Sequence, residues 1–487
     1  MKALVIGDLI LDKTIVCDVD RVAPEAPVAV GKVSHSFFTL GGAGNVANNL
    51  RSLGIEDVTL VGAVGADAAG EEVLEQCADA GFSTEYISTR ADNHSTTVKV
   101  RYVNRDRKML FRADYEKKDG TPSKMRLPLP EDIEQYDVIV LSDYDKGLFT
   151  DFAHFPSMRV ITAAKEYGIP VIVDCKPANI ALFKGASVIT PNRKEARELV
   201  QQERPGCATD DEVFGSNTLY DIAADFDILN IVVTMADDGI AVLHPSRHEA
   251  EVSLPNARGV HDVTGAGDVV VAALAVATVN KDLARDTWEA MLDFANAAAG
   301  ISVASPGTTS VRLSDVQAVL AEERIQKKIC KDPHALVLLC TAAKQIGRCV
   351  VFTNGCFDLL HPGHVHLLRE ARKEGDMLIA AVNTDESVRA LKGETRPVLP
   401  IETRMAALAA IDAVDVVIPF SEDTPEKLIR KLDPDVLVKG KHEDTCPHSG
   451  DPVPGADYVA SKGGRVVFVD VIPGYSTTAT LAAGTDA

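Results

Sequence analysis

Short β-rich runs that alternate with helical patterns are the feature that most limits how this chain can fold. In many cases about 30 residues separate one run from the next. Runs of this kind at this spacing predict strand–helix–strand units and a mainly parallel sheet. The first series of runs comprises KALVIGDL, DVTLVGAVG, DVIVLSDY, IPVIVDCK and ILNIVVTM.

A second series begins at GRCVVFTNG and continues through DMLIAAVN, VDVVIPF, PDVLVKG and GRVVFVD. Between the two series, SDVQAVLAEERIQKKICKDP predicts a helix with Ser314 as its N-cap and an end before Pro333. A chain of 487 residues is also too long for one compact core. We therefore predict an α/β domain over 1–328, a connecting helical segment over 329–346 and a second α/β domain over 347–487.

A third pattern, between residues 96 and 113, differs from the parallel runs. Polar and apolar side chains alternate there with a period of two, which predicts an antiparallel ribbon with one polar face. Such a ribbon could cover a site as a lid. Because two-stranded ribbons are marginal alone, it could also associate with a partner surface, and we expect a homodimer.

Composition excludes several classes of function. The formal net charge of −21 disfavours a nucleic-acid partner, and anionic substrates then need local Lys, Arg, helix N-termini or Mg²⁺. The apolar run VVVAALAVATV is about half of a membrane span, and MKALVIGDLILD does not have the pattern of a secretion signal. The nine cysteines are scattered and include no C-x-x-C pair. We expect a cytoplasmic protein that does not act at a membrane.

The stretch DVTGAGD, residues 262–268, predicts a glycine turn that leads into an apolar helix. Converging backbone N–H groups and the positive end of the helix dipole would form an anion hole there. Asp268 at its mouth could accept a proton from an attacking hydroxyl. The alternative is an ordinary glycine turn in which Asp268 only caps the helix.

Other polar groups belong with this turn. TLGGAGNVANNLRSLG places amides after a Gly-Gly turn, where a sugar could dock, and Asp8 and Asp12 end the first strand. In TPNRKEA, Asn192 and Glu195 lie one helical turn apart and could orient nucleotide phosphates and the water bound to Mg²⁺.

Together these motifs resemble the ribokinase/PfkB family of sugar kinases over residues 1 to about 315. RVAPEAPVAV and LSDYDKG resemble the heptose-7-phosphate kinase branch more narrowly. The chain departs from the family pattern at Ala236, where glycine is usual, and at Cys175, where proline is usual.

The resemblance implies a role for each matching residue. Asp268 would be the catalytic base, and Glu195 would reach Mg²⁺ through a bound water. The remaining residues divide into three sets: the nucleotide and its phosphates would contact Asn192, Glu195, Thr264, Gly265, Ala266 and Gly267; the sugar would contact Asp8, Asp12, Gly42 and Asn45; and the phosphate of the substrate would contact Arg112 and Lys176. Solvated surface charges are an equal alternative for the last two.

In the second half, NGCFDLLHPGHVHLL carries an H-x-G-H turn between a predicted strand and a predicted helix. Gly363 would let the backbone approach a triphosphate, and both His361 and His364 could donate to phosphate oxygens at the helix N-terminus. With 12 His and 34 Gly in the chain, chance would produce this pattern only about 0.02 times. Histidines that serve only as caps or core groups are the alternative, and His366 on another helix face is expected to be structural. The spacing disfavours zinc.

This region resembles the cytidylyltransferase-like nucleotidyltransferases over about 348–480, and TNGCFDLLHPGH, AVNTDESVRALKG and RPVLPIETRMAAL resemble the ADP-heptose synthase branch. The loop KGKHEDTCPHSGDPVPG is longer than in that branch. The implied nucleotide-binding residues are Asn354, Gly355, Phe357, Gly363, Lys392, Arg396, Arg404, Lys439, Ser476, Thr477 and Thr478.

Both resemblances together imply an α/β protein: a ribokinase-like three-layer kinase domain with a small β lid, followed by a Rossmann-like nucleotidyltransferase domain. The implied enzyme phosphorylates D-glycero-D-manno-heptose 7-phosphate at C1 with ATP, and transfers AMP from ATP to heptose 1-phosphate. A separate phosphatase would remove the 7-phosphate in between. The alternatives are another phosphosugar, CTP as the nucleotide, or a sensing protein with decayed sites.

Overall fold

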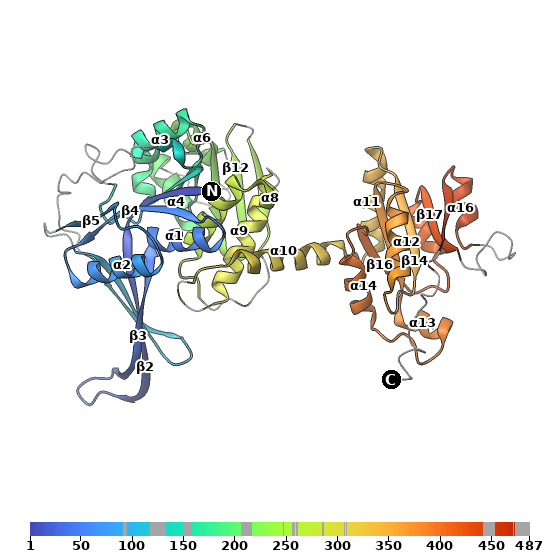
Figure 1. Ribbon diagram of the computed structural model, residues 1–487, viewed down its shortest axis with the longest axis horizontal. Helices are drawn as coiled ribbons and strands as arrows, with labels where there is room; N and C mark the ends of the chain where they lie inside the picture. Colours follow the sequence, from blue (N-terminus) through green and yellow to red (C-terminus); the bar gives the residue numbers. More distant parts are fainter. Residues whose placement is uncertain are drawn as a thin grey trace. The chain divides into compact units, whose positions relative to one another are not determined.

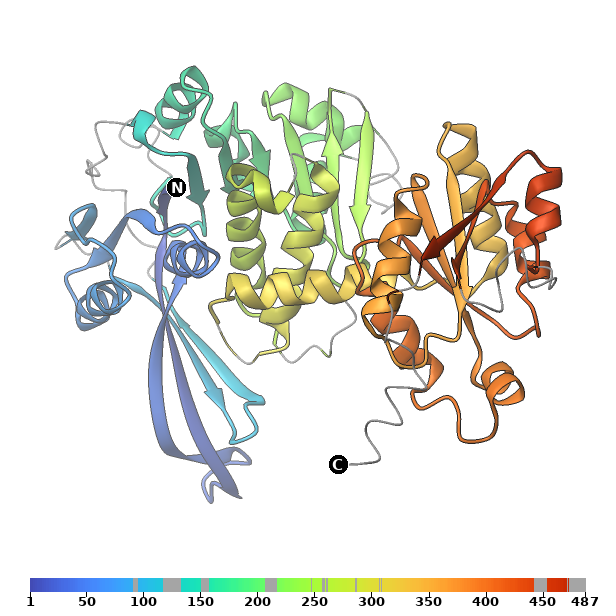
Figure 2. The same cartoon turned by 45° about the vertical axis from the view of Figure 1, so that its right-hand side comes forward.

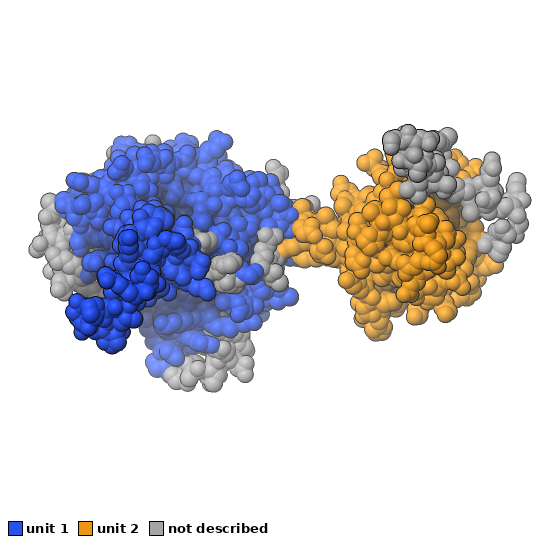
Figure 3. All heavy atoms as spheres, turned by 90° about the horizontal axis from the view of Figure 1, so that it is seen from below, with its two compact units in different colours: residues 1–320 blue, residues 321–487 orange. Residues whose placement is uncertain are grey.

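The structure of the chain is a computed structural model with two compact units, Met1–Leu320 and Ala321–Ala487 (Figure 3). It describes residues 1–90, 95–116, 133–149, 157–205, 217–246, 248–255, 259, 262–284, 287–305, 307, 309–441, 453–470 and 472. Among the helices in these ranges, none is both long and apolar enough to cross a lipid bilayer.

The first unit is built on a nine-stranded sheet with the order β13-β12-β11-β10-β9-β8-β1-β4-β5. The five runs predicted from the sequence are β1, β4, β8, β9 and β11, and the strands from β11 to β5 pair in parallel, as predicted. The strands are β1 Lys2–Gly7, β4 Asp57–Gly65, β5 Ile87–Arg90, β8 Val138–Ser142, β9 Val171–Asp174, β10 Val188–Ile189, β11 Asn230–Thr234, β12 Ile240–His244 and β13 Glu249–Ser253.

Helices cover both faces of this sheet, which gives the predicted three layers (Figures 1 and 2). Alternate residues of β1 show why, because Val5 packs with one set of helices and Ile6 packs with the other. The first set is α1 Ala43–Ser52, α2 Ala68–Asp79, α7 Ala266–Val279, α9 Trp288–Val303 and the start of α10 Leu313–Lys328; the second is α3 Ser157–Glu166, η2 Pro177–Phe183, α4 Arg193–Glu203 and α6 Thr218–Asp225.

The order of strands reverses between β1 and β8. From β1 the chain adds β4 and β5 on one side, and it then adds β8 to β11 on the other. In open α/β sheets, ligands bind outside the carboxyl ends of strands at such a switch point. The residues that follow β1 and β8 are therefore placed to form a site.

The lid is a separate four-stranded sheet with the order β3-β2-β6-β7, which extends from the body as the blue and cyan strands of Figure 2. The predicted ribbon is confirmed as β6 Thr97–Val103 paired antiparallel with β7 Met109–Tyr115. β6 also pairs in parallel with β2 Leu9–Val22, which pairs with β3 Ala29–Gly42. The sequence prediction missed this long hairpin.

The second unit contains a five-stranded parallel sheet with the order β16-β15-β14-β17-β18, and this confirms the Rossmann-like prediction. The strand order reverses at β14, so its switch point lies between β14 and β17. The elements are β14 Val350–Gly355, α12 Pro362–Arg372, β15 Met377–Asn383, α13 Asp385–Lys392, α14 Ile401–Ala409, β16 Val416–Phe420, α15 Glu426–Leu432, β17 Val436–Lys441, α16 Ala456–Ser461 and β18 Arg465–Asp470.

The predicted boundary segment differs from the observed division. Helix α10 begins at Leu313, so Ser314 lies in its first turn and is not its N-cap. The next helix, α11 Pro333–Gln345, buries Leu336 and Cys340 in a core of the second unit. The segment predicted as a connection over 329–346 therefore belongs to the packed second unit.

Two candidate active sites

The first site is built around the start of α7. Gly265 has a φ of 75°, a left-handed conformation that glycine adopts freely, and it turns the chain into the helix. Asp262 holds the turn, because its carboxylate accepts from the N–H of Thr264 at 2.9 Å and from the N–H of Gly307 at 2.9 Å. A Cβ added at Gly267 would meet no atom of the described residues within 4 Å, so that part of the chain leaves this side of the turn open.

Asp268 lies in the first turn of α7 and is only 3% exposed. Its Oδ2 accepts from Asn45 Nδ2 at 2.7 Å, and its Oδ1 accepts from the Tyr144 hydroxyl at 2.5 Å. Burial raises the pKa of Asp268 to about 6, although both hydrogen bonds act to lower it. The carboxyl is thus ionised at neutral pH and basic enough to accept a proton.

The predicted sugar-binding residues gather beside Asp268 at the switch point. Asp8 follows β1 and accepts from the backbone N–H of Tyr144 at 2.8 Å. Gly42 has a φ of 57°, and a Cβ there would lie 2.5 Å from the carbonyl oxygen of Asp8, so only glycine fits. Asp12 forms a buried ion pair with Arg101 of β6 at 2.6 Å, which fixes the lid strand against β2.

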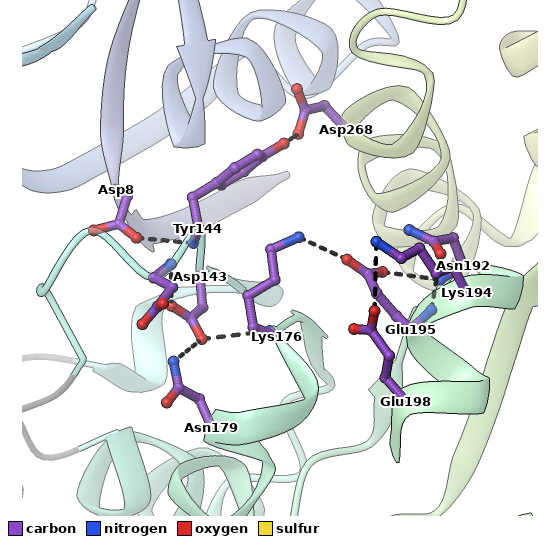
Figure 4. Close-up of polar contacts among 11 residues, drawn as sticks. Asp8, Asp143, Tyr144, Lys176, Asn179, Asn192, Lys194, Glu195, Glu198 and Asp268 are labelled. Carbon is purple, nitrogen blue, oxygen red and sulfur yellow. Dashed lines mark hydrogen bonds and ion pairs between the residues drawn. The ribbon is translucent and has the colours of Figure 1, made fainter. Parts of the chain in front are cut away.

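Several buried acids surround the same point. Burial and the charge of Asp143 raise the pKa of Asp8 to about 7. Burial and the charge of Asp268 raise the pKa of Asp174, the last residue of β9, to about 8. Asp143 itself accepts from Asn179 Nδ2 at 2.8 Å (Figure 4). Carboxyls this close to neutrality mark a functional region, because burial of acids costs stability.

Asn192 and Glu195 form a capping box at the start of α4. The N–H of Glu195 donates to Asn192 Oδ1 at 3.0 Å, and the N–H of Asn192 donates to Glu195 Oε2 at 3.0 Å. The other oxygen, Glu195 Oε1, accepts from Lys176 Nζ at 2.6 Å, as Figure 4 shows. The structure therefore places Lys176 between the predicted nucleotide residues and the sugar side.

Arg112 lies on β7 of the lid, where its guanidinium pairs with Asp114 at 2.5 Å.

The structure also describes the two positions that depart from the kinase pattern, Ala236 and Cys175. Ala236 has a φ of 51°, which costs an L-residue other than glycine about 1–2 kcal/mol. Cys175 is buried, and this burial raises the pKa of its thiol well above the usual range.

Sequence reasoning assigned no role to Tyr144, Asp143, Asp174 or Lys99, which all lie in this region. Lys99 of β6 has its Nζ 4.9 Å from the centre of the Tyr144 ring. The motif LSDYDKG at the end of β8 was available as a signal. The sequence alone did not give the order of the strands. That order places β8 next to β1 at the switch point, and so brings this motif to the site.

The second site lies where β14 gives way to α12. His361 is the N-cap residue of that helix, and the N–H of His364 donates to the carbonyl of His361 at 2.9 Å. The two imidazole rings stack, with centres 3.8 Å apart and planes 23° from parallel. Phe357, at a φ of 46°, presents its ring edge-on to His364 with centres 5.2 Å apart.

His361 Nδ1 is buried and has no hydrogen-bond partner among the described residues. Burial lowers the pKa of this imidazole, so it is neutral at pH 7. Buried polar atoms are normally satisfied, and an orphaned nitrogen at a helix N-terminus fits a ligand that supplies the missing contact. Both predicted histidines therefore line one candidate phosphate site.

Lys439 and Asn354 come from neighbouring strands at this switch point. Lys439 Nζ donates to Asn354 Oδ1, and burial lowers the pKa of Lys439 to about 8. Gly355 is the last residue of β14, and Gly363 lies in the first turn of α12. The side-chain oxygen of Asn354 is neutral and does not offset the charge of the Lys439 ammonium. This contact therefore favours the binding of an anion beside Lys439.

The predicted arginines have different settings. Arg396 pairs with the buried carboxylate of Asp358. Arg404 is 1% exposed, and it donates to the carbonyls of Leu399 at 3.0 Å and Cys356 at 2.6 Å. Arg404 thus links the loop that follows β14 to the loop that precedes α14. Lys392 is exposed at the end of α13, and Ser476, Thr477 and Thr478 lie outside the described residues.

Comparisons with known proteins agree with this arrangement. The family model for pfkB family carbohydrate kinases matches residues 2–315, and the cytidylyltransferase-like model matches residues 352–448. The bifunctional protein HldE of Actinobacillus pleuropneumoniae is 36% identical over 98% of this chain and 96% of the relative. The HldE of Alkalilimnicola ehrlichii is 39% identical over 99% of this chain and 96% of its own length.

The fold of the first unit has a solved counterpart. Ribokinase from Giardia lamblia superposes with a TM-score of 0.50 at 19% identity, and the match covers 66% of this chain and 99% of the ribokinase. This likeness concerns the fold alone, and it confirms the ribokinase-like prediction.

The similarity over the full length of the chain, the two family matches and the two candidate sites thus indicate the same family. The chain belongs to the bifunctional HldE family, in which a pfkB-type carbohydrate kinase is joined to a cytidylyltransferase-like nucleotidyltransferase.

Proposed function

We propose that the first unit transfers the γ-phosphoryl group of ATP to the C1 hydroxyl of D-glycero-D-manno-heptose 7-phosphate. The observation that carries this proposal is Asp268, a buried carboxylate with a raised pKa at the N-terminus of α7. The hydroxyl proton goes to Asp268 as the new O–P bond forms. The bond from γ-phosphorus to its bridging oxygen breaks, and ADP leaves with that electron pair.

Binding of ATP falls to residues on two helix N-termini. Thr264, Gly265, Ala266 and Gly267 lie at the start of α7, where backbone and dipole favour phosphate oxygens. Asn192 and Glu195 lie at the start of α4. The products are heptose 1,7-bisphosphate and ADP.

Mg²⁺ accompanies ATP in this proposal. Within the described ranges, no cluster of three or more His, Cys, Asp or Glu side chains could hold a metal ion. Mg²⁺ keeps several waters and binds through few carboxylates together with substrate phosphates. Both oxygens of Glu195 are engaged by Lys176 and Asn192, so Glu195 would reach the ion through a bound water. The ion would neutralise charge on the phosphates.

On the acceptor side, Asp8, Asp12, Gly42 and Asn45 are proposed to line the sugar pocket. Lys176 and Arg112 are proposed to serve the 7-phosphate. Each would exchange a present carboxylate partner, Glu195 or Asp114, for that phosphate.

We propose that the second unit joins AMP from ATP to heptose 1-phosphate. An oxygen of the sugar phosphate attacks the α-phosphorus, the bond to the β-phosphate oxygen breaks, and pyrophosphate leaves. His361, His364 and Lys439 would stabilise the negative charge that develops on the phosphates. Asn354, Gly355, Phe357, Gly363, Lys392 and Arg396 are proposed to contact the nucleotide, and Ser476, Thr477 and Thr478 to cap its phosphates. For Arg404, burial favours support of these loops over direct contact.

The two reactions act on one sugar carbon in sequence. A separate phosphatase is proposed to remove the 7-phosphate between them, so that the product, ADP-heptose, carries one sugar–phosphate link. The reactions need ATP, and we place the protein in the cytoplasm.

A homodimer through the lid is proposed because Met109, Phe111 and Tyr115 of β7 are more than half exposed, at 53%, 62% and 61%.

A phosphorus NMR time course tests the whole proposal. With ATP, Mg²⁺ and heptose 7-phosphate, a C1 phosphate signal should appear and stop at the bisphosphate. Added bisphosphate phosphatase should then allow pyrophosphate and ADP-heptose to form. No C1 phosphate would refute the kinase assignment, and a preference for CTP with heptose 1-phosphate would refute the adenylyl assignment.

A further inference from the structure

Tyr144 contacts the proposed catalytic base directly. Its hydroxyl donates to Asp268 Oδ1 at 2.5 Å, while Asn45 Nδ2 donates to Oδ2 at 2.7 Å. A carboxylate held at both oxygens cannot rotate about its Cβ–Cγ bond without losing a charge-assisted hydrogen bond. The plane of the Asp268 carboxylate is therefore fixed by two residues that are far away in sequence.

The ring of Tyr144 is itself held by two lysines. Lys99 of the lid strand β6 lies 4.9 Å from the ring centre, and Lys176 lies 5.6 Å from it. Lys176 also pairs with Glu195 on the nucleotide side at 2.6 Å. The backbone N–H of Tyr144 donates to Asp8 on the sugar side (Figure 4). Tyr144 thus connects the base with the lid and the nucleotide residues through its side chain, and with the sugar residues through its backbone N–H.

We propose that Tyr144 is a positioning residue for phosphoryl transfer, which orients the Asp268 carboxylate towards the acceptor hydroxyl. This inference rests on the kinase function proposed for the first unit. Tyr144 does not act as a base, because burial and the charge of Asp268 raise its pKa well above the usual value. It stays protonated and donates throughout the pH range of an assay.

The charged groups around Asp268 set the sign of the expected pH effect. Asp12 of β2 raises its pKa, and Lys99 of β6 and the hydrogen bond from Tyr144 lower it. Asp174 at the end of β9 is also electrostatically coupled to Asp268. Removal of the Tyr144 hydroxyl takes away one lowering contribution. The pKa of Asp268 should then rise above its present value of about 6.

Tyr144→Phe is the test variant, because it removes the hydroxyl and keeps the ring between the lysines. Tyr136→Phe is the matched control. Tyr136 precedes β8 as Tyr144 follows it, and its hydroxyl donates to Thr59 Oγ1 at 3.0 Å, away from the base. We expect Tyr144→Phe to lower the kcat of phosphorylation about tenfold and to shift the acid limb of its pH profile upwards by about one unit, with little change in KM for ATP.

The control should lose stability without a shift of that limb. If Tyr144→Phe behaves like Tyr136→Phe, with an unshifted limb and a similar kcat, Tyr144 is only a structural residue and the inference is wrong. Tyr144→Leu removes both the ring and the hydroxyl, so its acid limb should also be shifted upwards.

An NMR experiment decides the point without any turnover. The chain has nine tyrosines, so labelling at the ring carbon that bears the hydroxyl gives a simple spectrum. The resonance that disappears in Tyr144→Phe should titrate with a midpoint near 6 and stop titrating in Asp268→Asn. Lack of titration would refute the contact. A titrating Tyr144 in an enzyme that rejects heptose 7-phosphate would refute the substrate but leave the positioning role intact.

Discussion

Lys439 offers a sharp test of the second site. Its ammonium is buried at the switch point between β17 and β14, where its contact is the neutral side-chain oxygen of Asn354. Burial lowers its pKa from 10.5 to about 8. If a polyphosphate supplies the missing negative charge, the protonated lysine should be needed for nucleotidyl transfer.

The lowered pKa of Lys439 sets the size of the expected effect on nucleotidyl transfer. With a pKa of about 8, about nine-tenths of Lys439 is charged at pH 7 and about one-tenth at pH 9. The kcat/KM for ATP should therefore fall about tenfold between these pH values. Lys439→Arg keeps its charge and should abolish this alkaline limb, whereas Lys439→Met should be slow at every pH.

The same shift predicts an effect on stability of opposite sign. The folded pKa lies about 2.5 units below the unfolded value, so the charged form costs the fold about 3 kcal/mol. This cost is full below pH 8 and disappears as pH rises towards 10.5. Lys439→Met should therefore stabilise the substrate-free second unit at pH 7 by up to about 3 kcal/mol, less its lost hydrogen bond to Asn354.

Pyrophosphate release from pH 6.5 to 9.5 and calorimetric melting at pH 7 measure both effects on the same three proteins. An alkaline limb that persists in Lys439→Arg would show that another group titrates. A Lys439→Met variant that melts below the wild type would show that the ammonium is already stabilised in the free protein. Either result would refute the reasoning.

Four further outcomes are expected. Asp268→Asn should lower phosphorylation by about 10³-fold or more and leave nucleotidyl transfer near normal, since the sites act separately; joint loss would contradict this. Wild-type kinase kcat/KM should fall about tenfold per pH unit below pH 6, because Asp268 must be ionised, and a limb near pH 4 would show that its pKa is not raised. His364→Ala should lower nucleotidyl transfer by about 10²-fold or more with little change in Tm, whereas an unfolded variant would favour a structural histidine. Arg404→Met should cost the second unit about 2–4 kcal/mol in urea unfolding, because two part-buried carbonyls and the carboxylate of Asp385 lose their donor, and a neutral effect would favour direct contact of Arg404 with the nucleotide.

The sheets could be predicted, and the candidate residues at the two turns could be proposed, because their signals are local. A strand such as KALVIGDL is apolar along its length because helices cover both of its faces. Gly265 and Asp268 are close in sequence, so the turn and the carboxyl at its helix could be read together. The H-x-G-H turn is local in the same sense.

Contacts between distant segments could not be predicted in this way. Tyr144 and Asp268 are 124 residues apart, and only the strand order brings them together. Arg404 was expected to bind the nucleotide, but its burial depends on how α14 packs, and sequence does not show this. The β2–β3 hairpin was missed because its outer residues are exposed and mix valines with charged and small side chains, so it lacks the continuous apolar run of the central strands.

The buried acids of the first unit have a practical consequence. Asp8 and Asp174, with pKa values of about 7 and about 8, hold their protons more tightly when the chain is folded than when it is unfolded. These two carboxyls therefore contribute stability to the folded kinase half as pH falls through these values, down to the ordinary carboxyl range near 4. Long storage should favour a mildly acidic buffer, at the same pH at which that half turns over most slowly.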